Sequence, residues 1–282
     1  MIDLHSHMLP WVDEGACDLE DGLSLLEAAI RDGIELAVLT PTVDPSRWDN
    51  TAAKLRRKFN AFCEIAARRG FPIDLRLGAE AWLSPETLAL VEAGEVPFVG
   101  RWSDHDVLLL RWREEFVPIG AVSAMHRLLQ RRVLPMIAHP ERNLGLCRSP
   151  DALDLFVSEG CLVQVDAGSL VGLHGADVQA TAFHLIERGW VTVVASNARN
   201  LREGAPMLGG AHRVLGQRYG IEVADAFLRV NPAAIVGVEA PVLAAPPVAV
   251  EDIDDIPVLE PEPVAAGRSG GGRTRMERHT VH

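Results

Sequence analysis

Short apolar runs alternate along most of this chain with stretches in which apolar residues recur at helical spacing. This alternation is typical of βα units around a parallel sheet, because buried strands are short and continuously apolar while the covering helices are amphipathic. The pattern predicts seven strands, at Ile2–His5, Leu36–Thr40, Ile73–Glu80, Asp106–Arg111, Val133–His139, Leu162–Asp166 and Val191–Ser196. It predicts helices at Leu19–Arg31, Thr51–Arg69, Val122–Arg132, Ala152–Glu159, Val178–Arg188 and Ala211–Val230.

Seven βα units within about 240 residues fit one barrel better than two doubly wound domains. We therefore expect an α/β fold, a (β/α)7 barrel, at residues 1–240. The composition changes near Ala240, and residues 241–282 mix proline, glycine and acidic residues without apolar periodicity. Because such a segment cannot bury apolar surface, residues 241–282 are expected to form a disordered tail.

Composition narrows the class of protein and its partners. The 282 residues include 48% hydrophobic residues and carry a net charge of −12, so the chain has globular composition and no nucleic-acid partner is expected. The N-terminal MIDLHSHMLP has no basic segment before an apolar core, and no run of ~18 apolar residues occurs, so neither a secretory signal nor a membrane span is expected. Four cysteines without a CxxC pair indicate reduced thiols and a cytoplasmic location.

Polar residues follow nearly every predicted strand. Barrel enzymes assemble their chemistry at the C-terminal ends of the strands, so residues at these ends are expected to meet at one mouth. The residues concerned are His5, His7, Thr40, Thr42, Glu80, Arg111, His139, Asp166, Asn197 and Arg199. Turn residues such as glycine and proline would suffice for a purely structural rim, so this set predicts a functional site.

The first strand ends in His5-Ser6-His7. Side chains alternate along a strand, so both imidazoles should lie on the same side and share one ion. Zinc, manganese and iron all suit imidazole ligands, and a carboxylate such as Glu80 would complete the site. An HxH pair alone is weak evidence, but Glu14 and His139 are also expected near this mouth.

Several longer motifs carry a family resemblance. They are MIDLHSHMLPWVDEGACD, LTPTVDP, LGAEAWL, IAHPERN, VQVDAGSLVG, ASNARN and NPAAIVG, in this order. Over Met1 to Glu239 the chain resembles the CpsB/YwqE-type bacterial protein-tyrosine phosphatases of the PHP (polymerase and histidinol phosphatase) superfamily. The resemblance implies a distorted seven-stranded PHP-type barrel and a manganese-dependent phosphoesterase site.

The resemblance implies nine metal ligands, of which this chain keeps five. Those present are His5, His7, Glu14, Glu80 and His139, and the replaced positions are Thr42, Arg111, Asn197 and Arg199. A guanidinium group cannot deprotonate and repels a divalent cation, so the complete cluster is not expected. We expect at most one divalent ion, with manganese implied by the resemblance, held by His5, His7 and Glu80, with the Asn197 amide oxygen and His139 nearby.

The resemblance also implies arginines that bind phosphate. Arg142 matches one of them, and Arg202 lies near the second with altered spacing. Arg111 and Arg199 either add to this positive pocket, or point to solvent, or pair with Glu14 or Asp166, and the sequence leaves these alternatives open. Arginine forks bind phosphate oxygens in pairs and need no metal for it.

Two functions follow from the resemblance. The replaced ligands favour a pseudophosphatase that binds phosphotyrosine of a bacterial tyrosine kinase controlling capsule or exopolysaccharide synthesis. The alternative is an active manganese-dependent protein-tyrosine phosphatase, a phosphoric monoester hydrolase. An amidohydrolase is disfavoured, because many of these enzymes use a carbamylated lysine and the only lysines, Lys54 and Lys58, lie in a predicted helix. The sequence leaves open whether the chain forms a homo-oligomer.

One further motif is set aside. Cys63 and Arg69 have the CX5R spacing of cysteine-dependent tyrosine phosphatases. Those enzymes need a glycine-rich phosphate loop at the start of a helix, whereas this segment has a helical pattern without glycine. A cysteine nucleophile is therefore not expected.

Overall fold

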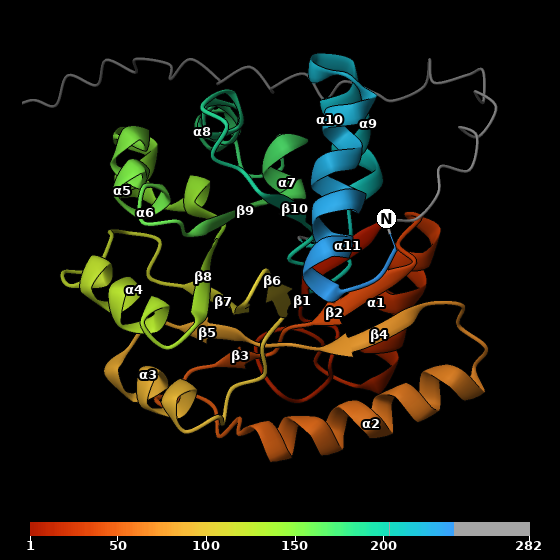
Figure 1. The fold of residues 1–282 in the computed structure, drawn as a ribbon. Coiled ribbons are helices and arrows are strands. Elements are labelled where there is room, and N and C mark those ends of the chain that lie inside the picture. The colour runs from red at the N-terminus through yellow and green to blue at the C-terminus, as the bar shows by residue number, and fades with distance from the viewer. Residues whose placement is uncertain (203, 240–282) are drawn as a thin grey trace, which may run out of the picture. The chain divides into compact units, whose positions relative to one another are not determined.

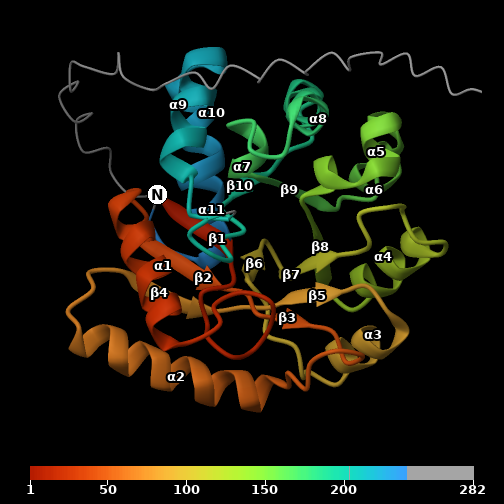
Figure 2. The ribbon, with the colours of Figure 1, turned by 180° about the vertical axis from the view of Figure 1, so that it is seen from behind.

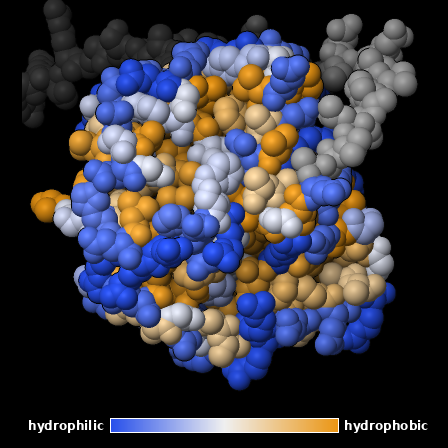
Figure 3. Space-filling view, viewed as in Figure 1, coloured by the Kyte–Doolittle hydropathy of each residue, from blue (hydrophilic) through white to orange (hydrophobic). Residues whose placement is uncertain are grey.

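A computed structural model describes residues 1–202 and 204–239 (Figure 1). The expected tail, residues 241–282, lies outside the described residues. No helix in the described part of the chain is long and apolar enough to cross a bilayer. On the face drawn in Figure 3, hydrophobic side chains lie scattered among hydrophilic ones, as on the surface of an ordinary folded domain.

Seven strand positions form the wall of the barrel, and two of them consist of two short strands each. They are β1 (Ile2–Ser6), β2 (Leu36–Leu39) with β3 (Thr42–Val43), β4 (Asp74–Leu77) with β5 (Glu80–Trp82), β7 (His105–Arg111), β8 (Val133–Ala138), β9 (Leu162–Asp166) and β10 (Val193–Ala195). Neighbouring strands pair in parallel, in the orders β1-β2-β4 and β10-β9-β8-β7-β5-β3. A parallel bridge between Ser6, at the end of β1, and Ala198, which follows β10, closes the barrel. This arrangement confirms the expected distorted (β/α)7 barrel.

The prediction of one continuous strand at Ile73–Glu80 is wrong, because the chain breaks between β4 and β5. β4 pairs with β2, whereas β5 pairs with β3 and β7. Gly78 lies at the break, where a Cβ atom would come within 2.9 Å of a Val38 methyl carbon and 3.2 Å of the Val99 Cα. The close approach of these segments lets one strand position serve two partial sheets.

Helices cover the outside of the strands. They are α1 (Leu19–Arg31), α2 (Ala52–Arg68), α3 (Pro85–Glu92), α4 (Ala121–Leu129), α5 (Leu144–Arg148), α6 (Asp154–Val157), α7 (Ala167–Leu170), α8 (Ala176–Glu187), α9 (Leu208–Tyr219), α10 (Ile221–Asp225) and α11 (Asn231–Val236). In Figure 2, α1 and α2 lie on the side of β2 and β4, and α3 and α4 lie on the side of β5, β7 and β8. The sequence pattern missed α3, α5, α7 and α11. It also missed the short strand β6 (Gly100–Trp102), which pairs antiparallel with β7.

Two predicted helices are divided. The stretch Ala152–Glu159 contains the end of a 3₁₀ turn (Pro150–Leu153) followed by α6. The stretch Ala211–Val230 contains α9, α10 and a π-helical turn (Ala226–Val230), with Gly220 at φ +95° between the first two. Glycine adopts this conformation readily, and it ends α9 where the apolar pattern alone predicts continuation.

The apolar core has two layers. Alternate side chains of the strands pack outward against the helices, and the others fill the barrel interior. The interior cluster contains Ile2, Leu4, Leu36, Val38, Val107, Leu109, Leu134, Met136, Leu162 and Val193, with Ala233, Ile235 and Val236 of α11. α11 therefore covers the N-terminal side of the barrel, and the polar residues are left at the opposite, C-terminal mouth.

Candidate metal and phosphate site

A bulge in β1 turns the two imidazoles of the HxH motif into the barrel. Asp3 pairs with Ala37 and Ser6 pairs with Leu39, so two residues of β1, Leu4 and His5, lie opposite the single residue between those partners. Leu4 belongs to the interior cluster, and simple alternation would then turn His5 away from it. The extra residue reverses this, and His5 and His7 both point into the mouth.

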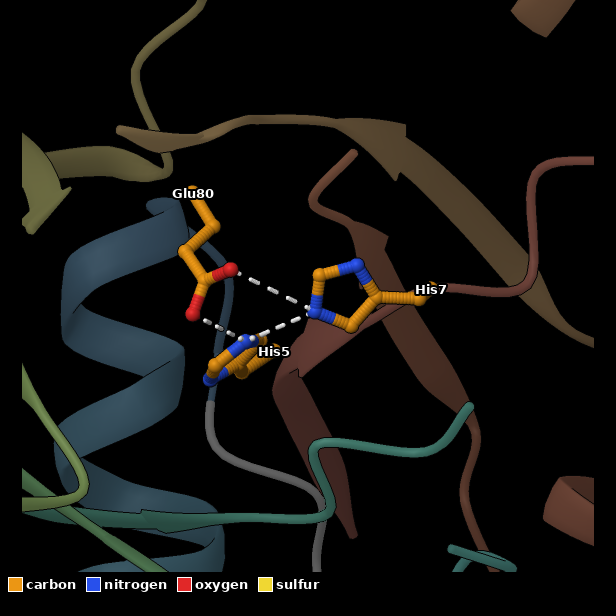
Figure 4. Close-up of side chains that lie close together, drawn as sticks. All are labelled: His5, His7 and Glu80. Atoms are coloured by element: carbon orange, nitrogen blue, oxygen red, sulfur yellow. Dashed lines mark hydrogen bonds and ion pairs between the residues drawn. The ribbon is translucent and has the colours of Figure 1, made fainter. Parts of the chain in front are cut away.

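His5, His7 and Glu80 form a fully buried cluster between β1 and β5 (Figure 4). The Nε2 atoms of His5 and His7 lie 3.1 Å apart. Glu80 Oε1 lies 3.3 Å from His5 Nε2, and Glu80 Oε2 lies 3.7 Å from His7 Nε2. One ligand atom from each residue lies within 4.8 Å of the others. His139 Nε2 lies 3.4 Å from Glu80 Oε1, so a third imidazole faces the same carboxylate.

The outer nitrogens of both imidazoles have acceptors. His7 Nδ1 lies 2.7 Å from Asp13 Oδ2, and His5 Nδ1 lies 2.9 Å from Gln164 Oε1. Asp13 is itself fixed by the Thr42 N–H, at 2.8 Å. With Nδ1 donating, each Nε2 keeps a lone pair directed at the other, and a shared cation satisfies both.

The two oxygens of Glu80 have different surroundings. Oε1 faces His5 and His139, whereas Oε2 accepts from Arg111 Nη1 at 3.0 Å and from Thr42 Oγ1 at 3.2 Å. Burial alone would raise the pKa of Glu80, but the guanidinium charge of Arg111 holds this pKa well below its usual range. Burial lowers the pKa of both His7 and His139. An ionised carboxylate beside neutral imidazoles is the ligand state that a divalent cation requires.

Arg111 and Arg199 pair with carboxylates at the barrel mouth and do not point to solvent. Glu14 Oε1 accepts from Arg199 Nη1 at 2.7 Å and from Arg111 Nη1 at 3.3 Å. Burial raises the pKa of Glu14, but the charge of Arg199 and the hydrogen bonds to the carboxylate together outweigh burial, and the pKa falls to about 2. Glu14 Oε2 is buried without a partner among the described residues. Of the alternatives left open by the sequence, the structure shows pairing with Glu14, and it adds Glu80.

His139 and Asn197 lie at strand ends in left-handed backbone conformations, with φ of +36° and +50°. Such conformations are uncommon for residues other than glycine and often occur at functional sites. The Asn197 side chain is already engaged, because Nδ2 donates to Asp166 Oδ2 at 2.9 Å and Oδ1 accepts from Arg199 Nε at 3.0 Å. The amide oxygen expected near a metal therefore faces a guanidinium group.

Arg142 lies beside this cluster and lines a cavity of about 260 Å³. Its Nη1 donates to Asp166 Oδ2 at 3.1 Å, and its Nη2 donates to Glu114 Oε1 at 3.0 Å. The cavity is lined by Arg142, Asp166, Gly168, Leu173, His174, Ser196, Asn197, Arg199, Asn200, Gly204 and Ala205. Arg202 is exposed and is not among these residues.

Sequence reasoning did not find several residues that support this site. Asp13 and Gln164 hold the imidazoles, and Glu114 holds Arg142. Glu141 is fully buried and accepts from the Asp166 N–H and Ser169 Oγ, and burial together with the Asp166 charge raises its pKa to about 8. Gln164 carried a usable signal, since a polar residue two positions before Asp166 in an apolar strand must share its interior face.

Cys63 lies within α2, away from the residues that line the cavity. Burial raises the pKa of its thiol to about 11, so the thiolate is scarce at neutral pH. These facts agree with setting the CX5R spacing aside.

The chain is similar in sequence to a known family and to several of its characterised relatives. A family model described as "Capsular polysaccharide synthesis, CpsB/CapC" matches residues 1–237. The tyrosine-protein phosphatase YwqE of Bacillus subtilis is 28% identical over 223 residues, which cover 79% of this chain and 87% of YwqE. The tyrosine-protein phosphatase CpsB of Streptococcus pneumoniae is 25% identical over 241 residues, which cover 84% of this chain and 98% of CpsB.

Solved structures give the same result. A structure from a study of YwqE and CpsB, described as "unique metal-dependent tyrosine phosphatases", matches with a TM-score of 0.74 and 28% identity over 79% of this chain and 90% of that one. A mutant organophosphorus hydrolase matches with a TM-score of 0.53 and 14% identity over 84% of this chain and 92% of that one, and shares the fold alone.

Proposed function

The chain belongs to the CpsB/CapC family of capsular polysaccharide synthesis proteins, and on this premise we propose that it is a phosphotyrosine-binding pseudophosphatase. It holds at most one divalent ion, and hydrolysis is slow or lost. The carrying observation is the pairing of Arg111 and Arg199 with Glu14 and Glu80, which leaves fixed guanidinium charge on carboxylates that a metal cluster would use.

One ion has a fitting set of ligands. His5, His7 and Glu80 would hold it, since both Nε2 lone pairs and Glu80 Oε1 are directed at one another, with His139 beside them. A bound divalent cation would supply Lewis acidity next to a phosphate ester, and manganese is the proposed ion. Additional cations would be repelled, since two unit charges ~4 Å apart cost ~4 kcal/mol at an effective dielectric constant near 20.

Phosphate recognition is assigned to the neighbouring cavity, with Arg142 as the principal anchor. Its guanidinium group lines the cavity and is held from behind by Asp166, which is buried. A phosphate group would accept hydrogen bonds from N–H groups at the edge of this oriented guanidinium group, and binding of this kind needs no metal. Arg202 is exposed outside the cavity lining, so Arg199 is the second guanidinium group available there.

The proposed partner is a phosphotyrosine segment of a bacterial tyrosine kinase in capsule or exopolysaccharide synthesis, in keeping with the family and the named relatives. A cytoplasmic location is proposed with it. All four cysteines, Cys17, Cys63, Cys147 and Cys161, are free, which supports a reducing compartment.

The test measures metal content, binding and turnover on one preparation. We expect at most one manganese per chain by elemental analysis, binding of a phosphotyrosine peptide that persists in excess chelator, and hydrolysis that manganese scarcely increases. The unphosphorylated peptide is the matched control and should not bind. Three ions per chain, or rapid manganese-dependent hydrolysis, would establish the active phosphatase instead.

A further inference from the structure

The cavity beside Arg142 has little positive charge for a phosphate site. Among the described residues, those that line the cavity and can ionise are Arg142, Arg199, Asp166 and His174, which give a net charge of +1 while His174 is neutral. Arg142 is also shared with Glu114, whose carboxylate lies 3.0 Å away. A phosphate ester carries nearly two negative charges at neutral pH. The cavity therefore needs a further positive group to balance the charge of such a ligand.

His174 is held at this cavity by a tight turn. The Gly175 N–H donates to the Gly172 carbonyl at 3.2 Å, and the Leu173 N–H donates to the Gly168 carbonyl at 2.9 Å. Gly172 and Gly175 have φ of +84° and +91°, conformations that glycine adopts readily. At Gly168, a Cβ atom would come within 3.0 Å of His174 Nε2. The glycines thus allow the imidazole to lie over the start of α7, at the cavity wall.

The His174 ring is half-buried, and neither of its nitrogens has a hydrogen-bond partner among residues 1–202 and 204–239. This separates His174 from His5, His7 and His139, each of which has a partner on at least one ring nitrogen. A polar ring that lines a cavity without a partner is available to a ligand.

Charged groups surround His174 on two sides. Arg142, Asp166 and Glu114 act on it from the strand ends and the loop after β7. The groove behind it, which His174 also lines, contains the ionisable residues Cys147, Arg148, Asp177 and His184. Burial lowers the pKa of His174, and Arg142 lowers it further against the two carboxylates. His174 is therefore mainly neutral at neutral pH while the cavity holds no anion.

We propose that His174 is a further anion-binding residue of this cavity, and that it takes up a proton when a phosphate dianion binds beside Arg142 and Arg199. The proposal rests on the proposed function, since it concerns the same phosphotyrosine. It names the group that supplies the missing charge, and it makes recognition dependent on pH.

The sign of the pH dependence follows from linkage. A bound dianion stabilises the imidazolium form, so the pKa of His174 is higher in the complex than in the free protein. Binding then takes up a proton between these two pKa values, and affinity falls as pH rises, by up to about tenfold per pH unit. Above pH 7 phosphotyrosine is already a dianion, because its second pKa is about 6, so the ligand itself contributes little.

Isothermal titration calorimetry tests this in buffers of different ionisation enthalpy at pH 7.2. The probe is a phosphotyrosine peptide flanked by alanine and serine, which adds no titrating side chain. We expect the unmodified protein to take up a substantial fraction of one proton per peptide bound. His174→Gln keeps a neutral donor, and it should remove this uptake and weaken binding roughly fivefold or more.

His184→Gln is the matched control, because His184 lines only the groove behind His174, and it should leave the proton uptake unchanged. His174→Asn serves as a second variant if the glutamine variant has a lower melting temperature. Two results would overturn the role of His174 and leave the proposed function intact. One is binding without proton uptake in the unmodified protein, and the other is proton uptake in both His174 variants equal to that of the unmodified protein. If the unmodified protein binds no phosphotyrosine peptide at all, both proposals fail.

Discussion

Two regions of the barrel mouth differ in how their charges are balanced. The inner cluster consists of His5, His7 and Glu80, and the outer cavity is the one that Arg142 lines. In the inner cluster, Glu80 is fully buried and is paired with Arg111, with three imidazoles around it. In the outer cavity, Arg142 is paired with Glu114 and Asp166 but remains partly exposed, and His174 has no hydrogen-bond partner within the described residues. The charge of Glu80 is balanced by Arg111, whereas Arg142 lines a cavity with space for a ligand. This difference is what the proposed function requires, since it assigns phosphotyrosine binding to the cavity and little or no metal-dependent hydrolysis to the cluster.

Restoring the replaced ligands gives the largest expected effect. The combined change Thr42→His, Arg111→Glu, Asn197→Asp and Arg199→His removes two fixed cations and adds four ligands. It should raise the metal content above one ion per chain and increase hydrolysis of a phosphotyrosine peptide by roughly 100-fold. Elemental analysis and initial rates with manganese measure both quantities.

The control for that experiment is Arg111→Gln with Arg199→Gln, which removes the cations without supplying ligands. It should not gain comparable activity. A folded fourfold variant, shown by its melting curve, that gains neither ions nor rate would mean that more than charge separates the inner cluster from a catalytic site.

Arg142→Ala tests the outer cavity. It should weaken phosphotyrosine binding by about 10- to 100-fold, since hydrogen bonds between charged groups are worth about 1.5–3 kcal/mol. Arg148→Ala is the matched control, because Arg148 lines the neighbouring groove and not this cavity, and it should change the affinity less than about twofold. Equal losses in the two variants would indicate general attraction by surface charge instead of a defined cavity.

Acid should destabilise the inner cluster. The pKa of Glu14 is lowered to about 2, so its pairing with Arg199 stabilises the fold above the ordinary value of 4.5 and is lost as pH falls from there towards 2. Discounted for solvent screening, the loss is about 1 kcal/mol, or ~2–4 °C in melting temperature.

Glu14→Gln should remove most of this difference between melting curves at pH 5 and pH 3. Glu20→Gln, which breaks a surface ion pair with Arg69, is the matched control and should leave the difference as it is. An unchanged acid response in Glu14→Gln would show that the inner pairing contributes little to stability.

Truncation after Glu239 gives the smallest expected effect. The remaining chain should melt within ~5 °C of the full chain and bind phosphotyrosine equally well, because residues 241–282 have no apolar periodicity with which to join the core. Scanning calorimetry and the same peptide titration measure this. Tighter binding after truncation would mean that the acidic segment competes for the outer cavity, and a larger fall in stability would mean that it packs on the barrel.

The sequence by itself determined the barrel, the family and the residue types at its mouth. Period-two and helical patterns are local, so α1 was predicted to the residue and all seven strand positions were found. The break at Gly78 and the division of the last helical stretch were not predicted. Both depend on contacts and glycine conformations that the apolar pattern does not encode.

Only the tertiary structure decided how the site residues face one another. A single extra residue in β1 determines whether His5 and His7 point inward, and alternation alone cannot reveal it. The sequence left open whether Arg111 and Arg199 meet solvent, a ligand or a carboxylate, and distances between residues far apart in the chain settled it in favour of Glu14 and Glu80. His174 likewise became visible only when the fold placed its loop beside Arg142, because partners and burial are properties of the packed chain.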